Sequence, residues 1–287
     1  MKEISMSSAS RRSILTLAAA GPAAAMAGSA KAVPASSAGS LQSRPGEGRA
    51  AVITGSSRGI GAATARRLGA EGYAVTVNYL TNRDLAEQVV RDIESSGGRA
   101  IARQGDVADP AAVAALFDAN DRAFGGVDVV VNNAGRMNVG LFAQMTDAAF
   151  DRMMATNVKG SFNVLREAAR RTREGGRIIS LSSSITLQRP AGGGAYAASK
   201  AAQDFYTSAL AKELAGRQIS VNAVAPGAVD TQLLRQHGDA ALAGIPAMTP
   251  HGRIGLPEDI ANVIAALCSN DGQWIHGQVV FANGGIG

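Results

Sequence analysis

The sequence has almost no cysteine, few histidines and few aromatic residues. Its one cysteine, Cys268, excludes an intramolecular disulfide, and its three histidines, His237, His251 and His276, lack companions at metal-ligand spacing. We therefore expect no metal site. Aromatic residues make up only 4% of the chain, whereas glycine occurs 34 times. This balance favours an α/β protein with many tight strand-to-helix turns over a β-sandwich.

A strong excess of charge is also missing once the N-terminal segment is set aside. The formal net charge is +5, but four cations against one anion put +3 of it in the first 32 residues, which leaves 5 − 3 = +2. No basic stripe remains that could neutralise phosphates, so we do not expect a nucleic-acid partner. A chain of 287 residues with 46% hydrophobic residues can bury one sizeable core, so one folded domain is expected.

The first 32 residues have the layout of a twin-arginine export signal. Ser10–Leu15 carries the paired arginines, an alanine-rich apolar run continues to Met26, and the small residues Ala30–Ala32 follow. We expect a signal segment at 1–32, a Ser/Gly/Pro-rich linker at 33–48 and one folded domain at 49–287. A disordered tail, or a start codon placed too early, is the alternative explanation of the same residues.

This signal segment slightly favours a periplasmic location, and without export the protein would be cytoplasmic. Its apolar run is short and is interrupted by Gly21 and Pro22, so we expect no membrane span.

From Arg49 onward, short β-branched runs alternate with longer amphipathic segments. Such an alternation predicts repeated βα units, with a parallel sheet whose crossover helices cover both faces. We therefore expect one Rossmann-fold domain with a doubly wound, seven-stranded parallel sheet. The predicted strands are Ala50–Thr54, Ala74–Tyr79, Arg99–Gln104, Val127–Asn132, Arg177–Leu181, Ile219–Ala223 and Gln278–Phe281. The predicted helices end near Glu71, Ser95 and Phe124, or span about Asp147–Arg173, Ala195–Gly216 and Pro257–Cys268.

The first strand leads directly into a helix through the glycine-rich turn Thr54–Gly61. Glycines at this place let the backbone approach a pyrophosphate, and the helix N-terminus supplies N–H groups and positive potential. The alternative is an ordinary βα turn, but its position after the first strand of a βαβ unit favours dinucleotide binding. The residues expected to bind the cofactor here are Gly55, Ser57, Arg58, Gly59, Ile60 and Gly61.

The end of the second strand indicates which dinucleotide is bound. An acidic residue there would bind the ribose hydroxyls of NAD, but the strand ends in Asn78 and Tyr79. No carboxylate opposes a 2′-phosphate, and Arg58 can pair with one, so we expect NADP(H) to be favoured over NAD(H). Arg58 could instead be a solvated surface charge.

Tyr196 and Lys200 are four residues apart at the start of a predicted helix and therefore share one face. Ser183 lies upstream at the end of a strand, and Asn157 lies within the preceding helix. With this set the chain, from about Arg49 to its C-terminus, resembles the short-chain dehydrogenase/reductase family. The family motifs occur in order: Thr54–Gly61, Asp106-Val107, Asn132–Gly135, Asn157, Ser183, Tyr196, Lys200 and Pro226-Gly227.

The resemblance implies a role for each of these residues. Tyr196 would exchange a proton with the substrate oxygen, Lys200 would support it and hold the nicotinamide ribose, Ser183 would bind the substrate oxygen, and Asn157 would hold a relay water. The cofactor would also contact Asp106 and Val107 at the adenine, together with Asn133, Ala134, Gly135, Pro226, Gly227, Val229 and Thr231. Bland alternatives exist for single motifs: Asp106 could cap a helix, and Pro226-Gly227 could simply break a loop.

The chemistry attributed to Tyr196 requires a lowered pKa when it acts as a base. A free tyrosine has a pKa of about 10, and a fall of roughly 3 units corresponds to about 4 kcal/mol. One cation about 4 Å away at an effective dielectric near 20 supplies that order of energy. We therefore expect Lys200 to lower the pKa of Tyr196.

Substrate identity is not written in the sequence. The loops 136–141, 185–194 and about 232–253 predict an apolar, adaptable pocket with a mobile lid. The tail Trp274–Gly285 resembles that of ketoacyl-carrier-protein reductases and general alcohol dehydrogenases. This resemblance suggests an enzyme that acts on CH–OH groups, with a 3-oxoacyl compound or a small ketone as its carbonyl substrate. Resemblance also implies a homotetramer or homodimer built on the helices 147–173 and 195–216. The alternative is a catalytically idle NADP-binding redox sensor, although an intact Ser-Tyr-Lys-Asn set argues against it.

Overall fold

The structure is a computed structural model that describes residues 44–236, 238 and 242–286. The predicted signal segment and residues 33–43 of the predicted linker lie outside the described residues. Residues 44–48, assigned to the linker from the sequence, form a turn in which the Gly46 amide donates to the Glu71 carbonyl oxygen over 2.9 Å. The described structure therefore begins before Arg49, and from there on the chain forms one compact unit.

The centre of the molecule is one parallel sheet of seven strands, as predicted. Its strand order is β3-β2-β1-β4-β5-β6-β7, so the chain starts in the middle, builds outward to β3 and then returns to build the other half. The strands are β1 (Ala50–Ile53), β2 (Ala74–Tyr79), β3 (Arg99–Gln104), β4 (Val127–Asn132), β5 (Thr172–Leu181), β6 (Ser220–Pro226) and β7 (Val279–Ala282). This order places a topological switch point between β1 and β4, where doubly wound sheets bind ligands.

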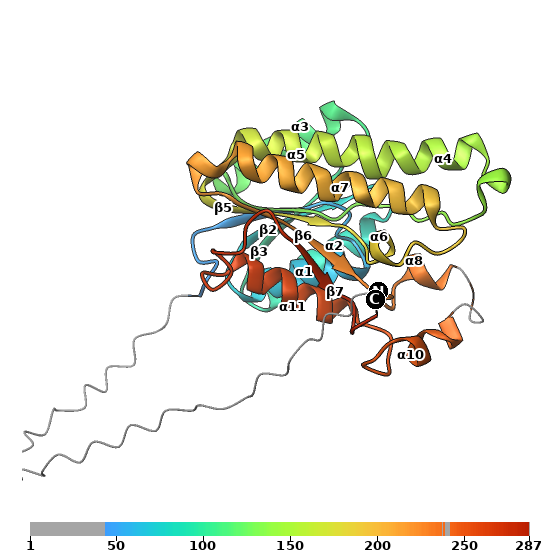
Figure 1. The fold of residues 1–287 in the computed structure, drawn as a ribbon. Helices are drawn as coiled ribbons and strands as arrows, with labels where there is room; N and C mark the ends of the chain where they lie inside the picture. Colours follow the sequence, from blue (N-terminus) through green and yellow to red (C-terminus); the bar gives the residue numbers. More distant parts are fainter. Residues whose placement is uncertain (1–43, 237, 239–241, 287) are drawn as a thin grey trace, which may run out of the picture. The chain divides into compact units, whose positions relative to one another are not determined.

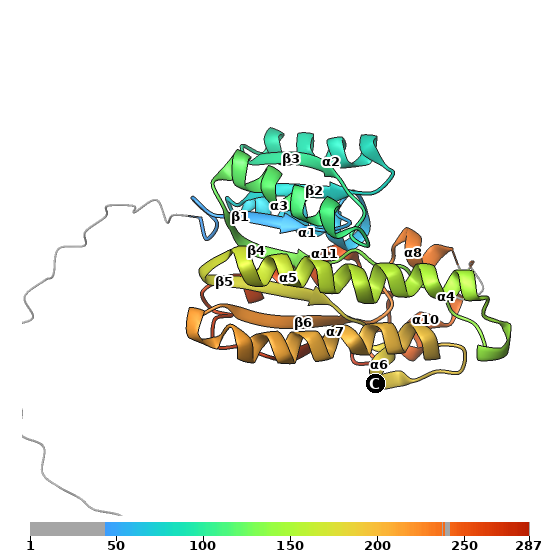
Figure 2. The same ribbon diagram turned by 90° about the horizontal axis from the view of Figure 1, so that it is seen from above.

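Helices cover both faces of the sheet (Figures 1 and 2). The long helices on one face are α3 (Pro110–Phe124), α4 (Asp147–Met154), α5 (Ser161–Arg171) and α7 (Gly194–Glu213); the other face carries α1 (Gly59–Ala70), α2 (Arg83–Ser95) and α11 (Pro257–Cys268). Short helices follow the carboxyl ends of the strands: α6 (Ile185–Gln188), α8 (Gln232–Arg235) and α10 (Ile245–Met248). The 3₁₀ turns are η1 (Phe142–Gln144) and η3 (Ala215–Arg217). The predicted Rossmann fold is confirmed.

Two apolar cores, one on each side of the sheet, follow from the alternation of side chains along the strands. Ile53 and Val131 point into the core under α1 and α11, whereas their neighbours Val52 and Val130 point into the core under α3 and α5. Both sets are fully buried. A sheet covered on both faces needs such continuous apolar strands, and the sequence provides them.

The prediction of one helix over about 147–173 is wrong in two details. It is interrupted by η2, a π-helical segment at Ala155–Gly160 that carries Asn157, and it ends at Arg171, where β5 begins directly with Thr172. β5 therefore starts earlier than the predicted Arg177, with an irregularity in its register against β4 between Val127 and Val129. The π-turn adds a residue to one helical turn and so changes the direction in which later side chains point, a device frequent at functional sites.

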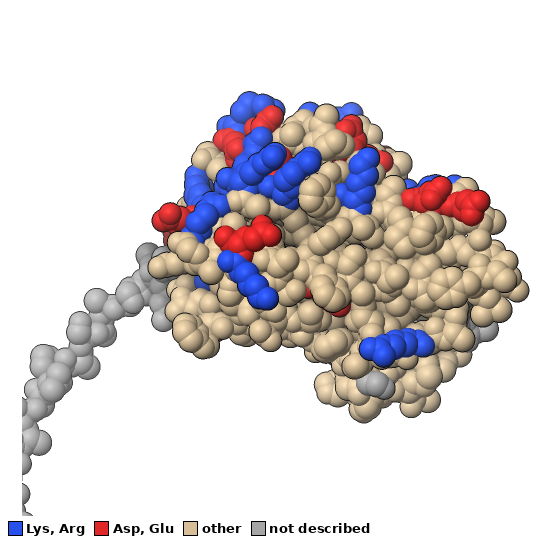
Figure 3. Space-filling view, turned by 45° about the horizontal axis from the view of Figure 1, so that its top comes forward, with Lys and Arg blue, Asp and Glu red and all other residues tan. Residues whose placement is uncertain are grey.

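Charged side chains over α3 and α5 are interleaved (Figure 3). Arg171 pairs with Asp118, Asp121 and Glu167 in one network. Among the described helices, none is long and apolar enough to cross a membrane. No cluster of three or more His, Cys, Asp or Glu side chains in the described ranges is placed to hold a metal ion.

Candidate active site

The glycine-rich turn lies at the switch point, between the end of β1 and the first turn of α1. Gly55 and Gly59 adopt φ values of +60° and +56°, in the left-handed region that favours glycine. Gly61 is needed for space, because a Cβ there would lie 2.6 Å from Asn133 Nδ2 and 2.7 Å from the Gly55 carbonyl oxygen. The turn is therefore shaped by close backbone approach, as the phosphate-binding prediction requires.

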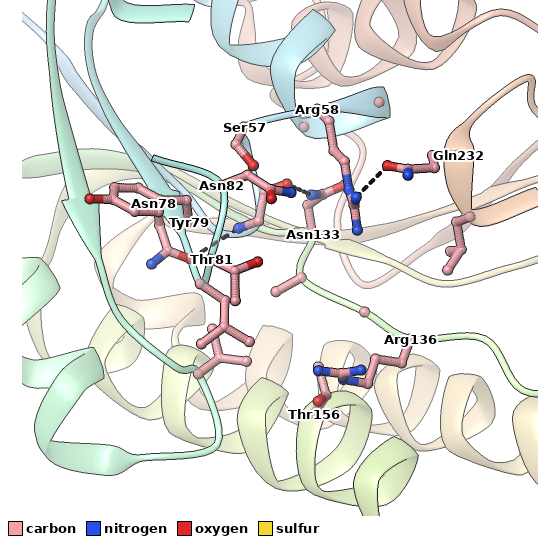
Figure 4. A pocket seen from close by; sticks show the side chains of 18 of the residues that line it. Ser57, Arg58, Asn78, Tyr79, Thr81, Asn82, Asn133, Arg136, Thr156 and Gln232 are labelled. Atoms are coloured by element: carbon pink, nitrogen blue, oxygen red, sulfur yellow. Dashed lines mark hydrogen bonds between the residues drawn. The ribbon is translucent and has the colours of Figure 1, made fainter. Parts of the chain in front are cut away.

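A cavity of about 450 Å³ opens in front of this turn (Figure 4). Fourteen predicted cofactor residues line it, from the turn, the ends of β2 and β4, and the loops after β3 and β6: Gly55, Ser57, Arg58, Gly59, Ile60, Gly61, Asn78, Tyr79, Asp106, Val107, Asn133, Ala134, Gly135 and Thr231. The sequence did not predict Thr81 and Asn82 beyond β2 or Thr156 across the cavity as lining residues. Arg136 and Gln232 also line this cavity, although the sequence placed them in loops of the substrate pocket. Only the spatial juxtaposition of these loops reveals them.

The side chains expected to select the dinucleotide are partly engaged within the protein. Asn78 is buried; its Oδ1 accepts from the Gly55 amide over 3.0 Å and its Nδ2 donates to the Gly105 carbonyl oxygen over 3.0 Å. Tyr79 packs into the core. Arg58 is exposed and hydrogen-bonds Gln232 across the cavity mouth (Figure 4). Arg58 is therefore the side chain that can turn to a 2′-phosphate, whereas Asn78 shapes the turn.

The charge balance of the cavity favours an anion. The first turn of α1 contains no acidic side chain, so the positive end of the helix dipole is unopposed. Among the described lining residues there are two arginines, Arg58 and Arg136, and one carboxylate, Asp106. Asp106 Oδ1 accepts from the Ala108 amide over 2.9 Å. This local turn bond is close to the capping role considered from the sequence, although Asp106 also lines the cavity.

Asn157 lies on η2 at the catalytic end of the site and is completely buried. Its Oδ1 accepts from the Arg136 amide over 2.8 Å, and its Nδ2 donates to the Arg136 carbonyl oxygen over 2.8 Å and to Ser199 Oγ over 2.9 Å. The side chain thus clamps the backbone that follows Gly135. Gln203 Nε2 donates to the Asn157 carbonyl oxygen over 3.1 Å. Asn157 Oδ1 accepts one bond and keeps a second acceptor position, and the relay water implied by the resemblance stays a prediction.

Lys200 is 4% exposed, and its Nζ donates to the carbonyl oxygen of Leu181 at the end of β5 over 2.5 Å. Burial lowers the pKa of Lys200 to about 8, and the field of Asp204 opposes that fall. A Cβ at Gly135 would lie 3.5 Å from Lys200 Nζ and 3.6 Å from Asn157 Oδ1. Gly135 therefore joins the dinucleotide cavity to the catalytic residues.

Tyr196 is buried on the first turn of α7, above the end of β5. Burial raises the pKa of Tyr196 to about 12, and a hydrogen bond with the Ser183 hydroxyl opposes the rise. The expected lowering by Lys200 is thus not found in the protein alone. At neutral pH the phenol carries its proton, which suits a proton donor to a carbonyl oxygen.

The predicted contacts after β6 are divided between two places. Thr231 lines the cavity, and its hydroxyl also caps α8 by accepting from the Leu234 amide. Gly227 and Val229 line a second cavity of about 320 Å³ beside β7, and Pro226 ends β6. Gly227 has no room for a side chain, because a Cβ would lie 2.9 Å from Asn283 Cα. The structure therefore does not bring these three residues to the cavity wall with the others.

The residues present fit a dinucleotide. The crowded glycine turn, the unopposed helix N-terminus and the arginine at the cavity mouth suit phosphates. Lys200 and Asn157 lie next to Gly135, which lines the same cavity. Gly135 lies between the dinucleotide cavity and Lys200, and a Cβ added to it would already be in van der Waals contact with Lys200 Nζ. A reactive end of the ligand beside Lys200 and phosphates at the turn are thus compatible with one elongated ligand.

Comparison with known proteins agrees with this arrangement. Residues 55–287 match the family profile described as enoyl-(acyl carrier protein) reductase. The chain is 42% identical over 249 residues to a short-chain type dehydrogenase/reductase of Picea abies, covering 83% of this chain and 92% of that protein. It is 40% identical over 252 residues to versicolorin reductase stcU of Emericella nidulans, covering 83% and 96%.

A solved structure shows the same fold. A short-chain dehydrogenase from Burkholderia cenocepacia, crystallised in complex with NADP, superposes with a TM-score of 0.81 at 39% identity, covering 84% of this chain and 99% of that one. The similarity spans the sheet and the catalytic segment rather than a single motif.

Proposed function

The chain belongs to the short-chain dehydrogenase/reductase family, and we propose that it is an NADP(H)-dependent oxidoreductase that moves a hydride between the nicotinamide and a carbonyl or secondary alcohol. The observation that carries the proposal is that Gly135, on the wall of a cavity shaped for a dinucleotide, lies next to buried Lys200 and Asn157, while Tyr196 on the same helix as Lys200 is hydrogen-bonded to Ser183. A bound nicotinamide supplies the hydride at its C4 atom.

The protein's own residues handle the proton. In the reductive direction, the Tyr196 phenol donates its proton to the substrate oxygen as the carbonyl carbon accepts the hydride. Ser183, already hydrogen-bonded to the phenol, is placed to hold the same oxygen. Lys200 contributes a buried positive charge at the end of β5, where its Nζ donates to the Leu181 carbonyl oxygen.

NADP(H) is favoured over NAD(H) by the end of β2 and by Arg58. No carboxylate follows Tyr79 along the cavity, where the lining residues are Leu80, Thr81 and Asn82. Arg58 needs only to release Gln232 to reach a 2′-phosphate at this place. The NADP complex of the related Burkholderia protein supports the same assignment.

The test is transfer of deuterium from NADPH deuterated at C4 to a panel of carbonyl compounds that includes small ketones and 3-oxoacyl thioesters. We expect at least one product alcohol to carry one deuterium on the carbon that bears its hydroxyl group. NADPH that binds but passes no deuterium to any member of the panel would favour the redox-sensor alternative instead.

We also propose that the protein assembles as a homotetramer or homodimer through α4, α5 and α7. Phe150, Phe162 and Phe205, one on each of these helices, are 41%, 48% and 76% exposed. Large apolar side chains exposed on helices of the same side of the sheet favour protein–protein contact. Light scattering of the parent and of Phe205→Glu tests this, with dissociation expected in the variant.

A further inference from the structure

The end of β5 lies against a third residue of α7, Asp204, in addition to Tyr196 and Lys200. Three consecutive residues, 181–183, each contact α7: the Leu181 carbonyl oxygen accepts from Lys200, the Ser183 hydroxyl bonds Tyr196, and the Ser182 hydroxyl lies against the carboxylate of Asp204. The three α7 residues are four apart, so they lie on one helical face. Asp204 is the member of this row that the proposed function does not yet use.

Asp204 is a half-buried carboxylate with little to compensate its burial. Its Oδ1 is inaccessible to solvent and has no hydrogen-bond partner of good geometry, and the same is true of Ser182 Oγ. Burial raises the pKa of Asp204, while the Ser182 hydroxyl, the Lys200 charge and the Thr186 hydroxyl oppose the rise. A carboxylate in such a place is costly unless a cation balances it.

Lys200 is that cation. Among the described residues, Lys200 is the one charged group whose field acts on Asp204, and Asp204 is the one whose field acts on Lys200. The two form no direct ion pair, so Nζ stays directed at Leu181 and the catalytic end of the site. The lysine thus gains the carboxylate's field without being drawn away from its position.

Other charged groups on the elements around α7 do not enter this pair. Glu167 and Arg171 of α5 bond to each other. The charged side chains of α4, of η2 and after α6 are exposed at the surface: Asp147, Asp151, Arg152, Lys159 and Arg189. None of them contributes to the pKa of Lys200 or of Asp204.

We propose that Asp204 is a positioning residue that keeps buried Lys200 in its ammonium form, with the Ser182 hydroxyl lying against its carboxylate. Asp204 itself touches neither the dinucleotide cavity nor the phenol, since it lies two helical turns beyond Tyr196. The use of this ammonium in hydride transfer rests on the proposed function, whereas its charge state does not.

The experiment is a direct titration of Lys200 in the full chain by NMR of lysine labelled with ¹³C at Cε. The chain has only five lysines, Lys2, Lys31, Lys159, Lys200 and Lys212, so the signals can be resolved and Lys200→Met assigns the one that disappears. We expect the parent's Lys200 to titrate near 8. Because loss of a nearby negative charge disfavours the ammonium, Asp204→Asn lowers that pKa by roughly 0.5–1 unit.

Asp204→Glu, which retains the charge, restores the parent pKa to within about 0.3 unit. Asp84→Asn, which removes an exposed carboxylate on α2, leaves it unchanged. A Lys200 pKa unmoved in folded Asp204→Asn overturns the proposal. If that variant does not fold, Ser182→Ala carries the test: a smaller fall supports the proposal and an unchanged pKa overturns it.

A rate measurement separates this proposal from the proposed function. In Asp204→Asn the alkaline limb of the kcat/KM profile for a reduced carbonyl moves to lower pH together with the NMR titration. If the protein reduces no carbonyl but the Lys200 pKa falls in Asp204→Asn, the role of Asp204 is supported and the oxidoreductase function is refuted. If the protein reduces a carbonyl but the Lys200 pKa is the same in the parent and in Asp204→Asn, the oxidoreductase function is supported and the role of Asp204 is refuted.

Discussion

The Asn157 side chain forms two hydrogen bonds with the backbone of Arg136: its Nδ2 donates to the Arg136 carbonyl oxygen over 2.8 Å, and its Oδ1 accepts from the Arg136 amide over 2.8 Å. The clamp ties the π-turn of η2 to the segment that follows Gly135. It therefore fixes the distance between the dinucleotide cavity and Lys200. The role of the side chain is architectural, and its effect on catalysis passes through the backbone it holds.

Asn157→Ala is expected to lower both stability and turnover. The substitution removes two part-buried hydrogen bonds to the Arg136 backbone, which costs about 1–3 kcal/mol in the free energy of unfolding. Chemical denaturation measures that loss, and kcat measures the displacement of the site. Asn163→Ala is the matched control, because it removes one buried bond, to the Val107 carbonyl oxygen. Equal loss of kcat in both variants would contradict the clamp.

Arg58→Glu is expected to shift the cofactor preference from NADP(H) toward NAD(H). The substitution replaces a cation that can pair with the 2′-phosphate by an anion that repels it, so the ratio of kcat/KM for NADPH to that for NADH falls at least ~10-fold. Arg122→Glu makes the same charge change at an exposed position of α3 and should leave the ratio unaltered. An unchanged ratio of kcat/KM for NADPH to that for NADH in Arg58→Glu would contradict the assignment of Arg58 to the 2′-phosphate.

Gly61→Ala is expected to close the phosphate turn. Its methyl group would overlap Asn133 Nδ2 and the Gly55 carbonyl oxygen, so the backbone must move away from the position that receives phosphates. NADPH affinity, followed by its fluorescence, should fall at least ~10-fold, or about 1.4 kcal/mol. Gly216→Ala is the control, since a Cβ at Gly216 meets nothing within 4 Å. Equal affinities in the two variants would contradict the fit of the turn to phosphates.

The pH dependence of reduction should follow Lys200 rather than Tyr196. The pKa of Lys200 is lowered to about 8 and that of Tyr196 is raised to about 12, so on raising the pH the ammonium is lost first while the phenol keeps its proton. The kcat/KM for reduction should therefore decline above about pH 8. In Lys200→Arg any residual activity should lack this limb, because a guanidinium does not titrate there. A decline that persists in Lys200→Arg would assign the limb to another group.

The same lowered pKa has a consequence for stability. Between about pH 8 and the ordinary lysine value of 10.5, the unfolded chain binds more protons at Lys200 than the folded chain does. Stability from this group therefore rises with pH through that window and is lowest below it. Burial of the ammonium is a cost of placing a cation at the end of β5.

The sequence predicted the sheet and the order of its motifs because those depend on local patterns. The continuous apolar runs of β1, β2 and β4 and the glycine turn identify themselves, and all four lie where expected. The π-turn at 155–160 was not predictable, because one extra residue in a helical turn hardly disturbs the apolar period. The early start of β5 at Thr172 was hidden for a similar reason, since its first residues are charged or glycine.

The site was predicted less completely than the fold because it depends on contacts distant in sequence. Asn78 was expected to meet the cofactor, but its side chain is consumed by the Gly55 amide and the Gly105 carbonyl oxygen. The effect of burial on Tyr196 outweighs the cation that the spacing suggested. Asp204 was overlooked because a carboxylate four residues after a helical lysine is usually a surface pair.

The most direct test of the account compares the parent with Tyr196→Phe, which removes one buried hydroxyl and little else. NADPH affinity should stay within about twofold, whereas kcat for carbonyl reduction should fall at least ~100-fold, because the proton donor is lost. Turnover by Tyr196→Phe within about tenfold of the parent's, at unchanged NADPH affinity, would contradict the assignment of Tyr196 as the catalytic acid.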